Sequence, residues 1–175
     1  KKIPIGKNPF YIPQKSICPK CNVILISIDT FRADELPCNG YLRNTSPNLC
    51  RFSNQNVSFT QAYSQTSWTM PSHFSIFTSL YPITHQMRIA FKDILNPQIM
   101  TLPQWLQRQG YRTVYVGPVN HPHLPLNKGL GRGFDVIIPY ESLTDWEKGF
   151  ERLRQNIKQN KSTFLFLHTY DIHNY

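Results

Sequence analysis

The sequence predicts a three-layer α/β/α sandwich with a mostly parallel central sheet. Continuous apolar runs at residues 22–28 and 163–168 each lead into a polar residue, as in strands that are buried on both faces of a parallel sheet. Segments with helix-start signals separate these runs, and this alternation is typical of parallel α/β proteins. With 40% hydrophobic and 17% charged residues in 175, the chain can build a core, which excludes a disordered or coiled-coil protein.

Each element is predicted from a local signal. Prolines at 4, 9, 13 and 19 indicate an irregular leader or linker over residues 1–20, followed by one ordered domain over 21–175. Ser46 as N-cap and Pro47 at the first position start a helix to about residue 55, and Pro71 starts another to about residue 80. Further helices are expected over 102–109 and 144–160, and strands over 22–28, 113–116 and 163–168. No internal repeat is found.

The charge and hydropathy of the chain limit the kinds of partner that it is expected to have. The formal charge is +9, from 19 Lys plus Arg against 10 Asp plus Glu. These basic residues are scattered rather than clustered, so no nucleic acid is expected as a partner. The longest apolar stretch, 23–28, is far below the roughly 20 residues that cross a bilayer, and no transmembrane segment is expected. The first residues lack the apolar core of a signal peptide, which fits either a removed signal or a cytoplasmic chain.

The four cysteines allow two readings. Cys18 and Cys21 have the spacing of half a zinc knuckle, but no second such pair follows. Disulfides within the pairs Cys18/Cys21 and Cys38/Cys50 are favoured over zinc if the compartment is oxidising.

Polar, reactive residues gather where a parallel sheet would bring them together. Asp29 follows the first strand, Thr69 lies just ahead of the helix started by Pro71, and His168 and His173 follow the last strand. A hydroxyl ahead of a helix lies near free backbone N–H groups, which stabilise a sulfate or phosphate. Thr69 is therefore placed to attack a bound anion if Asp29 holds a divalent cation that lowers the pKa of its hydroxyl. His168 or His173 would protonate the departing alkoxide.

Simpler roles exist for the same residues. Thr69 can merely cap its helix, Asp29 can cap the turn that follows its strand, and a histidine among aromatic residues is often a hydrogen-bonded structural group. His121 and His123, in a proline-rich loop, have no role that the sequence predicts.

Several motifs, in order, resemble the N-terminal half of the sulfatases, a branch of the alkaline phosphatase superfamily. The segment 22–36 reads NVILISIDTFRADEL, and it is followed by Gly40-Tyr41, RNTSPNL at 43–49, FTQAYS at 59–64, TMPSH at 69–73 and SLYPITH at 79–85. Looser matches are GYRTVYVG at 110–117, GRGFD at 131–135 and HTYDIH at 168–173. The resemblance covers nearly everything after residue 21.

The resemblance implies a role for each matching residue. Asp29 is the family's first metal-binding aspartate, and Thr30 occupies the place of a second aspartate. Thr69 matches the nucleophile position, which in typical sulfatases is a Cys or Ser converted to formylglycine. His73 replaces the arginine that supports this residue, and Pro118 replaces a lysine. His173 is expected to contact the anion or the leaving group, with His73, His168 and Asp171 lining the same pocket.

The resemblance therefore implies a hydrolase of sulfate or phosphate esters, with Thr69 and His173 as catalytic residues and Asp29, Thr30 and Thr69 at a metal. Calcium is the expected metal, with zinc or manganese as the alternative. Since threonine cannot become formylglycine by the usual route, a phosphodiesterase or a phosphoethanolamine or phosphoglycerol transferase is the first alternative. An inactive domain that binds anionic glycans is the second.

The expected partner is an anionic ester such as a sulfated glycan or a phospholipid headgroup, outside the cytoplasm. The family's remaining metal ligands come from a later strand, so the fold is expected to be incomplete at its C-terminus. These 175 residues alone are then expected to be inactive.

Overall fold

A computed structural model describes residues 21–89, 92–119, 121–140, 146–156 and 161–173. Its sheet has four strands in the order β1-β4-β2-β3, and all three pairings are parallel. The strands are β1 (Val23–Ile28), β2 (Arg112–Gly117), β3 (Val136–Pro139) and β4 (Thr163–Thr169). The predicted parallel sheet is thus confirmed, with β3 as a strand that the sequence analysis missed.

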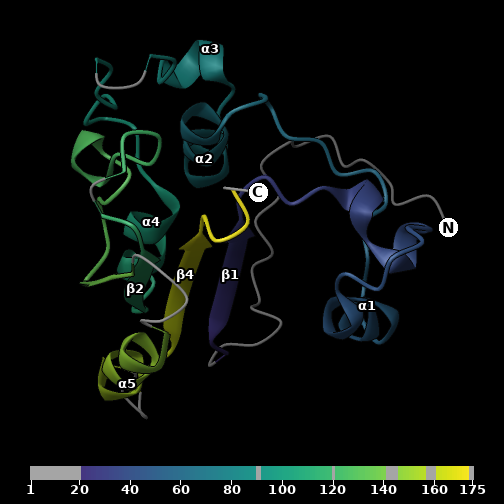
Figure 1. Ribbon diagram of the computed structural model, residues 1–175. Helices are drawn as coiled ribbons and strands as arrows, with labels where there is room; N and C mark the ends of the chain where they lie inside the picture. The colour runs from purple at the N-terminus through teal and green to yellow at the C-terminus, as the bar shows by residue number, and fades with distance from the viewer. Residues whose placement is uncertain (1–20, 90–91, 120, 141–145, 157–160, 174–175) are drawn as a thin grey trace, which may run out of the picture.

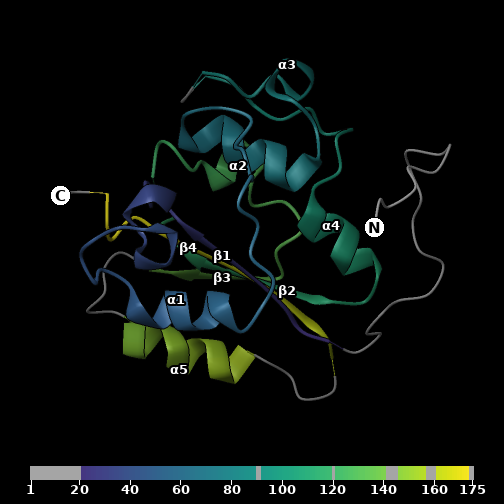
Figure 2. The same ribbon diagram turned by 90° about the vertical axis from the view of Figure 1, so that its right-hand side faces the viewer.

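Helices cover both faces of the sheet and complete a three-layer arrangement (Figure 2). They are α1 (Pro47–Asn54), α2 (Thr69–Thr78), α3 (Pro82–His85), α4 (Leu102–Arg108) and α5 (Trp146–Asn156), with short 3-10 turns η1 (Ala33–Glu35), η2 (Pro37–Asn39) and η3 (Leu126–Lys128). Helices α2, α3 and α4 lie on one side of the sheet, and α5 lies on the other. Helix α1 is on the α5 side but displaced beyond β1 (Figures 1 and 2). No described helix is long and apolar enough to span a bilayer.

The central strand β4 separates two hydrophobic clusters. Phe164 and Phe166 face α2 and pack with Met70, Phe74 and Tyr115. The alternate residues of β4, Leu165 and Leu167, face α5 and pack with Val114, Val116, Ile138 and Leu153. This alternation explains why β4 reads as a continuous apolar run, because both of its faces are buried.

The expectation for the first strand is wrong in one respect. We expected residues 22–28 to be buried on both faces, yet β1 is an edge strand. Ile24 and Ile26 are 62% and 58% exposed, because no helix among the described residues covers them on the α5 side. On the opposite face of β1, Leu25 is partly buried and packs against the α2 cluster.

The boundaries of helix α2 differ from the prediction by about two residues. Helix α2 begins at Thr69 rather than at Pro71 and ends at Thr78, followed by Ser79 as C-cap with φ of 57°. Phe74 and Phe77 point into the core as expected, whereas Ile76 is 47% exposed. The capping box expected at Thr144 and the end of the helix predicted over 144–160 lie outside the described residues.

The cysteine pairing confirms one of the two readings. Cys38 and Cys50 form a disulfide with a Cα–Cα distance of 5.4 Å, which ties η2 to α1. Cys21 is also disulfide-bonded. A zinc knuckle built on these cysteines is therefore excluded.

Candidate active site

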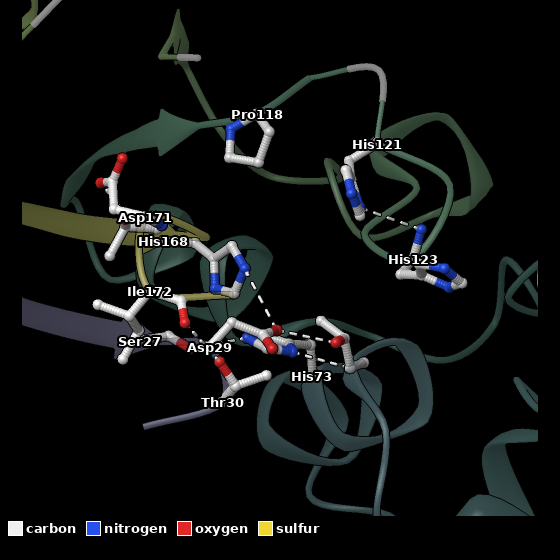
Figure 3. Close-up of polar contacts among 12 residues, drawn as sticks. Ser27, Asp29, Thr30, His73, Pro118, His121, His123, His168, Asp171 and Ile172 are labelled. Atoms are coloured by element: carbon white, nitrogen blue, oxygen red, sulfur yellow. Dashed lines mark hydrogen bonds and ion pairs between the residues drawn. The ribbon is translucent and has the colours of Figure 1, made fainter. Parts of the chain in front are cut away.

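The candidate site lies where β1 and β4 end and α2 begins (Figure 3). Ser27 of β1 is in register with His168 of β4, and the Asp29 backbone N–H donates to the Thr169 carbonyl at 3.0 Å. The parallel pairing therefore brings together two polar strand ends that are about 140 residues apart in the chain. Thr69, at the first position of α2, completes the group.

Thr69 and Asp29 are in direct contact. The Thr69 hydroxyl donates a hydrogen bond to Oδ2 of Asp29 at 2.8 Å. The Asp29 side chain is only 8% exposed, so little water competes for this bond. The N-cap of α2 is Trp68, and no side chain caps the helix. The simpler role of Thr69 as a helix cap is thus wrong, since its hydroxyl is directed at the carboxylate instead.

His73 links the start of α2 to β1. Its Nδ1 lies 2.8 Å from the Thr69 carbonyl, which can only accept, so Nδ1 carries the proton. Its Nε2, 2.9 Å from Oγ of Ser27, is then the acceptor for the serine hydroxyl. Burial lowers the pKa of His73, although the Thr69 carbonyl and the Asp29 charge oppose this shift. His73 is therefore a neutral group with both ring nitrogens engaged, and it contacts an anion only if one of these bonds is released.

His168 is the most enclosed member of the site. It is fully buried, and its Nε2 lies 3.8 Å from Oδ2 of Asp29, beyond hydrogen-bond distance. Neither ring nitrogen has a hydrogen-bond partner among the described residues. Burial lowers the pKa of His168 to about 3, helped by the nearby His73 and His121 rings. A neutral imidazole with unengaged nitrogens thus faces the Asp29 carboxylate.

Two rings that the sequence analysis did not assign to the site extend it from His168: Tyr170 contacts His168, and His121 contacts Tyr170. The Tyr170 ring is 4.6 Å from His168 and 4.1 Å from His121 between ring centroids. Burial raises the pKa of Tyr170, and the negative charge of Asp29 raises it further. Burial lowers the pKa of His121, as do His123 and His173.

A signal for both residues was present in the sequence. Tyr170 lies two positions after His168, and His121 follows β2, which pairs with β4. The carboxyl ends of neighbouring parallel strands meet at one edge of a sheet, so these side chains belong to the same region.

The other predicted site residues lie farther out. Thr30, with φ of 56°, donates from its hydroxyl to the Ile172 carbonyl at 3.4 Å and is exposed. His173 is exposed, with its ring 5.5 Å from that of Tyr170. The Asp171 carboxylate accepts from the hydroxyls of Tyr140 and Thr169, and it points away from Asp29 in Figure 3. This internal role does not favour the substrate contact expected of Asp171.

The described residues supply only part of a metal site. Asp29 is the one carboxylate at the centre, with the hydroxyls of Thr30 and Thr69 nearby, and no group of three or more His, Cys, Asp or Glu among the described residues is arranged to hold a metal. Hard cations such as Ca²⁺ take six to eight oxygen ligands. Asp29 therefore fits as one anionic ligand, and these residues alone do not complete the coordination.

Comparison with known proteins decides the family. A family model described as Sulfatase matches residues 21–175, which include every residue of the candidate site. The chain belongs to the sulfatase family. The parallel sheet agrees with the fold of solved sulfatase structures in the alkaline phosphatase superfamily.

Individual sulfatases and related structures agree with this assignment. An N-acetylgalactosamine-6-O-sulfatase of Bacteroides thetaiotaomicron is 31% identical over 123 residues, which are 68% of this chain and 24% of that protein. The structure of BT4656 in complex with its substrate D-glucosamine-2-N,6-O-disulfate gives a TM-score of 0.68 at 21% identity, over 85% of this chain and 34% of the other. A phosphonate monoester hydrolase of Agrobacterium radiobacter gives 0.64 at 18% identity, over 85% and 40%. The chain thus spans about a quarter of the length of the curated sulfatase that it matches.

Proposed function

We propose that this chain is the nucleophile-bearing part of a hydrolase that cleaves sulfate or phosphate esters, with Thr69 as the nucleophile. The observation that carries the proposal is the 2.8 Å hydrogen bond from the Thr69 hydroxyl to a nearly buried Asp29 carboxylate. A threonine hydroxyl needs a nearby base or a metal before it can attack at neutral pH. Asp29 is positioned to hold the proton of Thr69 as its oxygen bonds to sulfur or phosphorus.

The start of α2 supports an anion at the same place. Helix N-termini stabilise negative charge through their free N–H groups and dipole, and α2 has no side-chain cap that would occupy them. A sulfate or phosphate bound there would face Oγ of Thr69, and His173 at the rim would contact the leaving group. The bond from Thr69 to the sulfur or phosphorus forms as the ester bond to the alcohol breaks. Water then cleaves the threonine ester and restores the hydroxyl.

A divalent metal fits this scheme through Asp29, as expected from the sulfatase family. Bound there, with calcium as the first expectation and zinc or manganese as the alternative, it would lower the pKa of the Thr69 hydroxyl and neutralise the ester oxygens. Thr30 and Thr69 would be further oxygen ligands. Their hydroxyls are neutral, so most of the anionic ligands have to come from outside the described residues.

The identity of the nucleophile favours a second candidate. Thr69 cannot become formylglycine by the route that converts Cys or Ser, so a covalent sulfate would have to be removed by direct attack of water. This constraint favours a threonine-dependent phosphodiesterase or phosphotransferase as the alternative to a sulfatase. The substrate of a sulfatase would be a sulfated glycan, and that of a phosphodiesterase or phosphotransferase would carry a phospholipid headgroup. The Cys38–Cys50 disulfide supports an oxidising compartment for either enzyme, outside the cytoplasm.

The test compares an aryl sulfate, a phosphate monoester and a phosphodiester with the intact protein, with and without a chelator. We expect metal-dependent turnover of one ester class, a drop in kcat of at least about a thousandfold in Thr69→Ala, and partial activity in Thr69→Ser. Thr78→Ala, at the far end of α2, is the control and should stay near wild type. Full activity of Thr69→Ala would exclude Thr69 as the nucleophile. No turnover of any ester with metal supplied would favour the inactive glycan-binding domain.

A further inference from the structure

A large cavity among the described residues lies beside the candidate active site rather than within it. It measures about 940 Å³, and its lining comes from three parts of the chain: Ile94, Leu95 and Pro97, described residues between Val119 and Arg132, and Ile137 of β3. Its walls are mainly apolar, and they include Ile94, Leu95, Val119 and Leu126. A cavity of this size is in the usual range for a small-molecule site.

One lining residue connects this cavity to the catalytic centre. His121 lines the cavity, and its ring contacts that of Tyr170 in a tilted arrangement, with centroids 4.1 Å apart and planes inclined at 31°. Tyr170 in turn contacts His168, whose Nε2 is 3.8 Å from Asp29. Figure 3 shows His121 and His123 on the loop that follows Pro118. The backbone N–H of His123 donates to Nδ1 of His121 at 3.4 Å, so Nε2 is the donor that a neutral His121 offers to a ligand.

The two cations of the cavity wall differ in availability. The Arg132 guanidinium donates to the carbonyls of Asn96 and Ile99, and also to that of Gly129, so it holds the wall together. The Lys128 side chain makes no hydrogen bond or ion pair within the described part of the chain. An apolar cavity with one available ammonium group matches a ligand with an apolar body and an anionic substituent. A polyhydroxylated sugar would leave most of its hydroxyls without partners on these walls.

We infer that this cavity binds the alcohol portion of the ester, and that this alcohol is apolar, ring-sized and carries an anionic group. The inference rests on the proposed function, because it assigns the cavity to the departing alcohol, and it replaces the sulfated glycan proposed there with an apolar alcohol. His121 marks the junction, where its Nε2–H donates a hydrogen bond to the ester oxygen. Lys128 pairs with the anionic substituent inside the cavity.

Binding of product-like alcohols tests the cavity without requiring turnover. The probes are 2-naphthol and 6-hydroxynaphthalene-2-sulfonate, titrated into the intact protein and followed by fluorescence, with glucosamine 6-sulfate as a sugar comparison. Ile94 is 67% exposed and lines the cavity, so Ile94→Asp should fold and should weaken binding of both naphthols at least about tenfold. Lys128→Gln should weaken only the sulfonated probe. Ile83→Asp is the matched control, since Ile83 is 74% exposed and lies on α3, outside the cavity lining.

The outcomes separate this inference from the proposed function. Equal binding of the naphthols by Ile94→Asp and Ile83→Asp would overturn the inference. So would wild-type protein that binds glucosamine 6-sulfate more tightly than the naphthols and loses that binding in Ile94→Asp. With wild-type turnover established, Ile94→Asp should lower kcat/KM for a naphthyl ester at least about tenfold more than for a methyl ester, whereas equal losses for the two esters would overturn the inference. If no ester is turned over but naphthol binding still depends on Ile94, the proposed function fails and the cavity stands as a binding site.

Discussion

At the residue scale, Thr69 is held from two directions. Its hydroxyl donates to Asp29, and its carbonyl accepts from His73, which is itself the acceptor for Ser27. Ser27 and Asp29 are two positions apart around the end of β1 and approach the first turn of α2 together. The distance from nucleophile to carboxylate is therefore fixed by two contacts between the same two elements. Ser27 acts through His73, as a positioning residue.

Removing the Ser27 hydroxyl should misplace the nucleophile without removing it. In Ser27→Ala the buried Nε2 of His73 loses its donor, at a cost of about 1–3 kcal/mol in the free energy of unfolding. We expect kcat to fall about tenfold, with little change in KM, because geometry rather than binding is disturbed. Ser27→Thr keeps the hydroxyl and should recover most of the kcat. Unchanged kcat in Ser27→Ala, measured beside its thermal unfolding, would mean that His73 holds Thr69 without help from β1.

At the element scale, a single glycine sets how closely a loop approaches α4. Gly133 has φ of 86°, and a Cβ there would lie 2.3 Å from the backbone nitrogen of Gln104. That nitrogen belongs to a capping box with Thr101, whose hydroxyl also donates to the Arg132 carbonyl at 2.8 Å. A side chain at Gly133 would have to displace helix backbone, which is fixed by these bonds. The contact holds the start of α4 against the strand that follows the loop.

Two glycines with the same φ distinguish the cost of a left-handed backbone from the cost of a steric clash. Gly110 also has φ of 86°, but a Cβ there would meet nothing within 4 Å. We expect Gly110→Ala to lower the free energy of unfolding by about 1–2 kcal/mol, the cost of a left-handed backbone alone. Gly133→Ala should cost at least about 2 kcal/mol more, because Gln104 must move as well. Urea unfolding of both variants measures the difference, and equal losses would show that the loop yields without disturbing α4.

The same elements show why local patterns predicted some features and not others. The apolar runs of β1 and β4 and the proline-started helices stand out because each has its own signal in the sequence. The strand β3 has four residues, Val136–Pro139, and its last residue is a proline, so neither its length nor its composition distinguishes it from a loop. Thr69 was placed ahead of α2 because Pro71 marks a helix start, whereas the contact with Asp29 accompanies a start two residues earlier.

At the scale of the whole molecule, the sequence predicted the members of the site better than their arrangement. Asp29, Thr69, His73 and His168 converge as expected, because the carboxyl ends of parallel strands share one edge. Ser27 was missed because its contact with His73 joins segments 46 residues apart, whereas Tyr170 and His121 were missed although their positions after β4 and β2 marked them for the same edge. The exposure of β1 could not be predicted either. The residue pattern of a strand shows that the strand is apolar, but it does not show which elements pack against it.

Acid should destabilise the folded chain because several histidines are held neutral. Burial lowers the pKa values of His73, His85, His121 and His168 below the usual 6.5. Below that pH the unfolded chain binds more protons than the folded one, so the free energy of unfolding falls as the pH falls. The stabilisation is complete above about pH 6.5, and each histidine contributes a slope of at most about 1.4 kcal/mol per pH unit.

His85 provides a test of this effect away from the candidate site. It is 1% exposed, its Nδ1 accepts from the Met87 backbone N–H at 3.0 Å, and its Nε2 therefore donates to Ser75 at 3.1 Å. A protonated ring would have to place a second N–H against the Met87 N–H. Glutamine can keep the bond to Ser75 and cannot be protonated, so His85→Gln should reduce the loss of Tm between pH 7.5 and pH 4.5.

His123→Gln, at an exposed ring, should leave that loss unchanged. A Tm that stays constant or rises on acidification of the wild type would contradict the effect, and equal losses in all three proteins would show that His85 has no part in it.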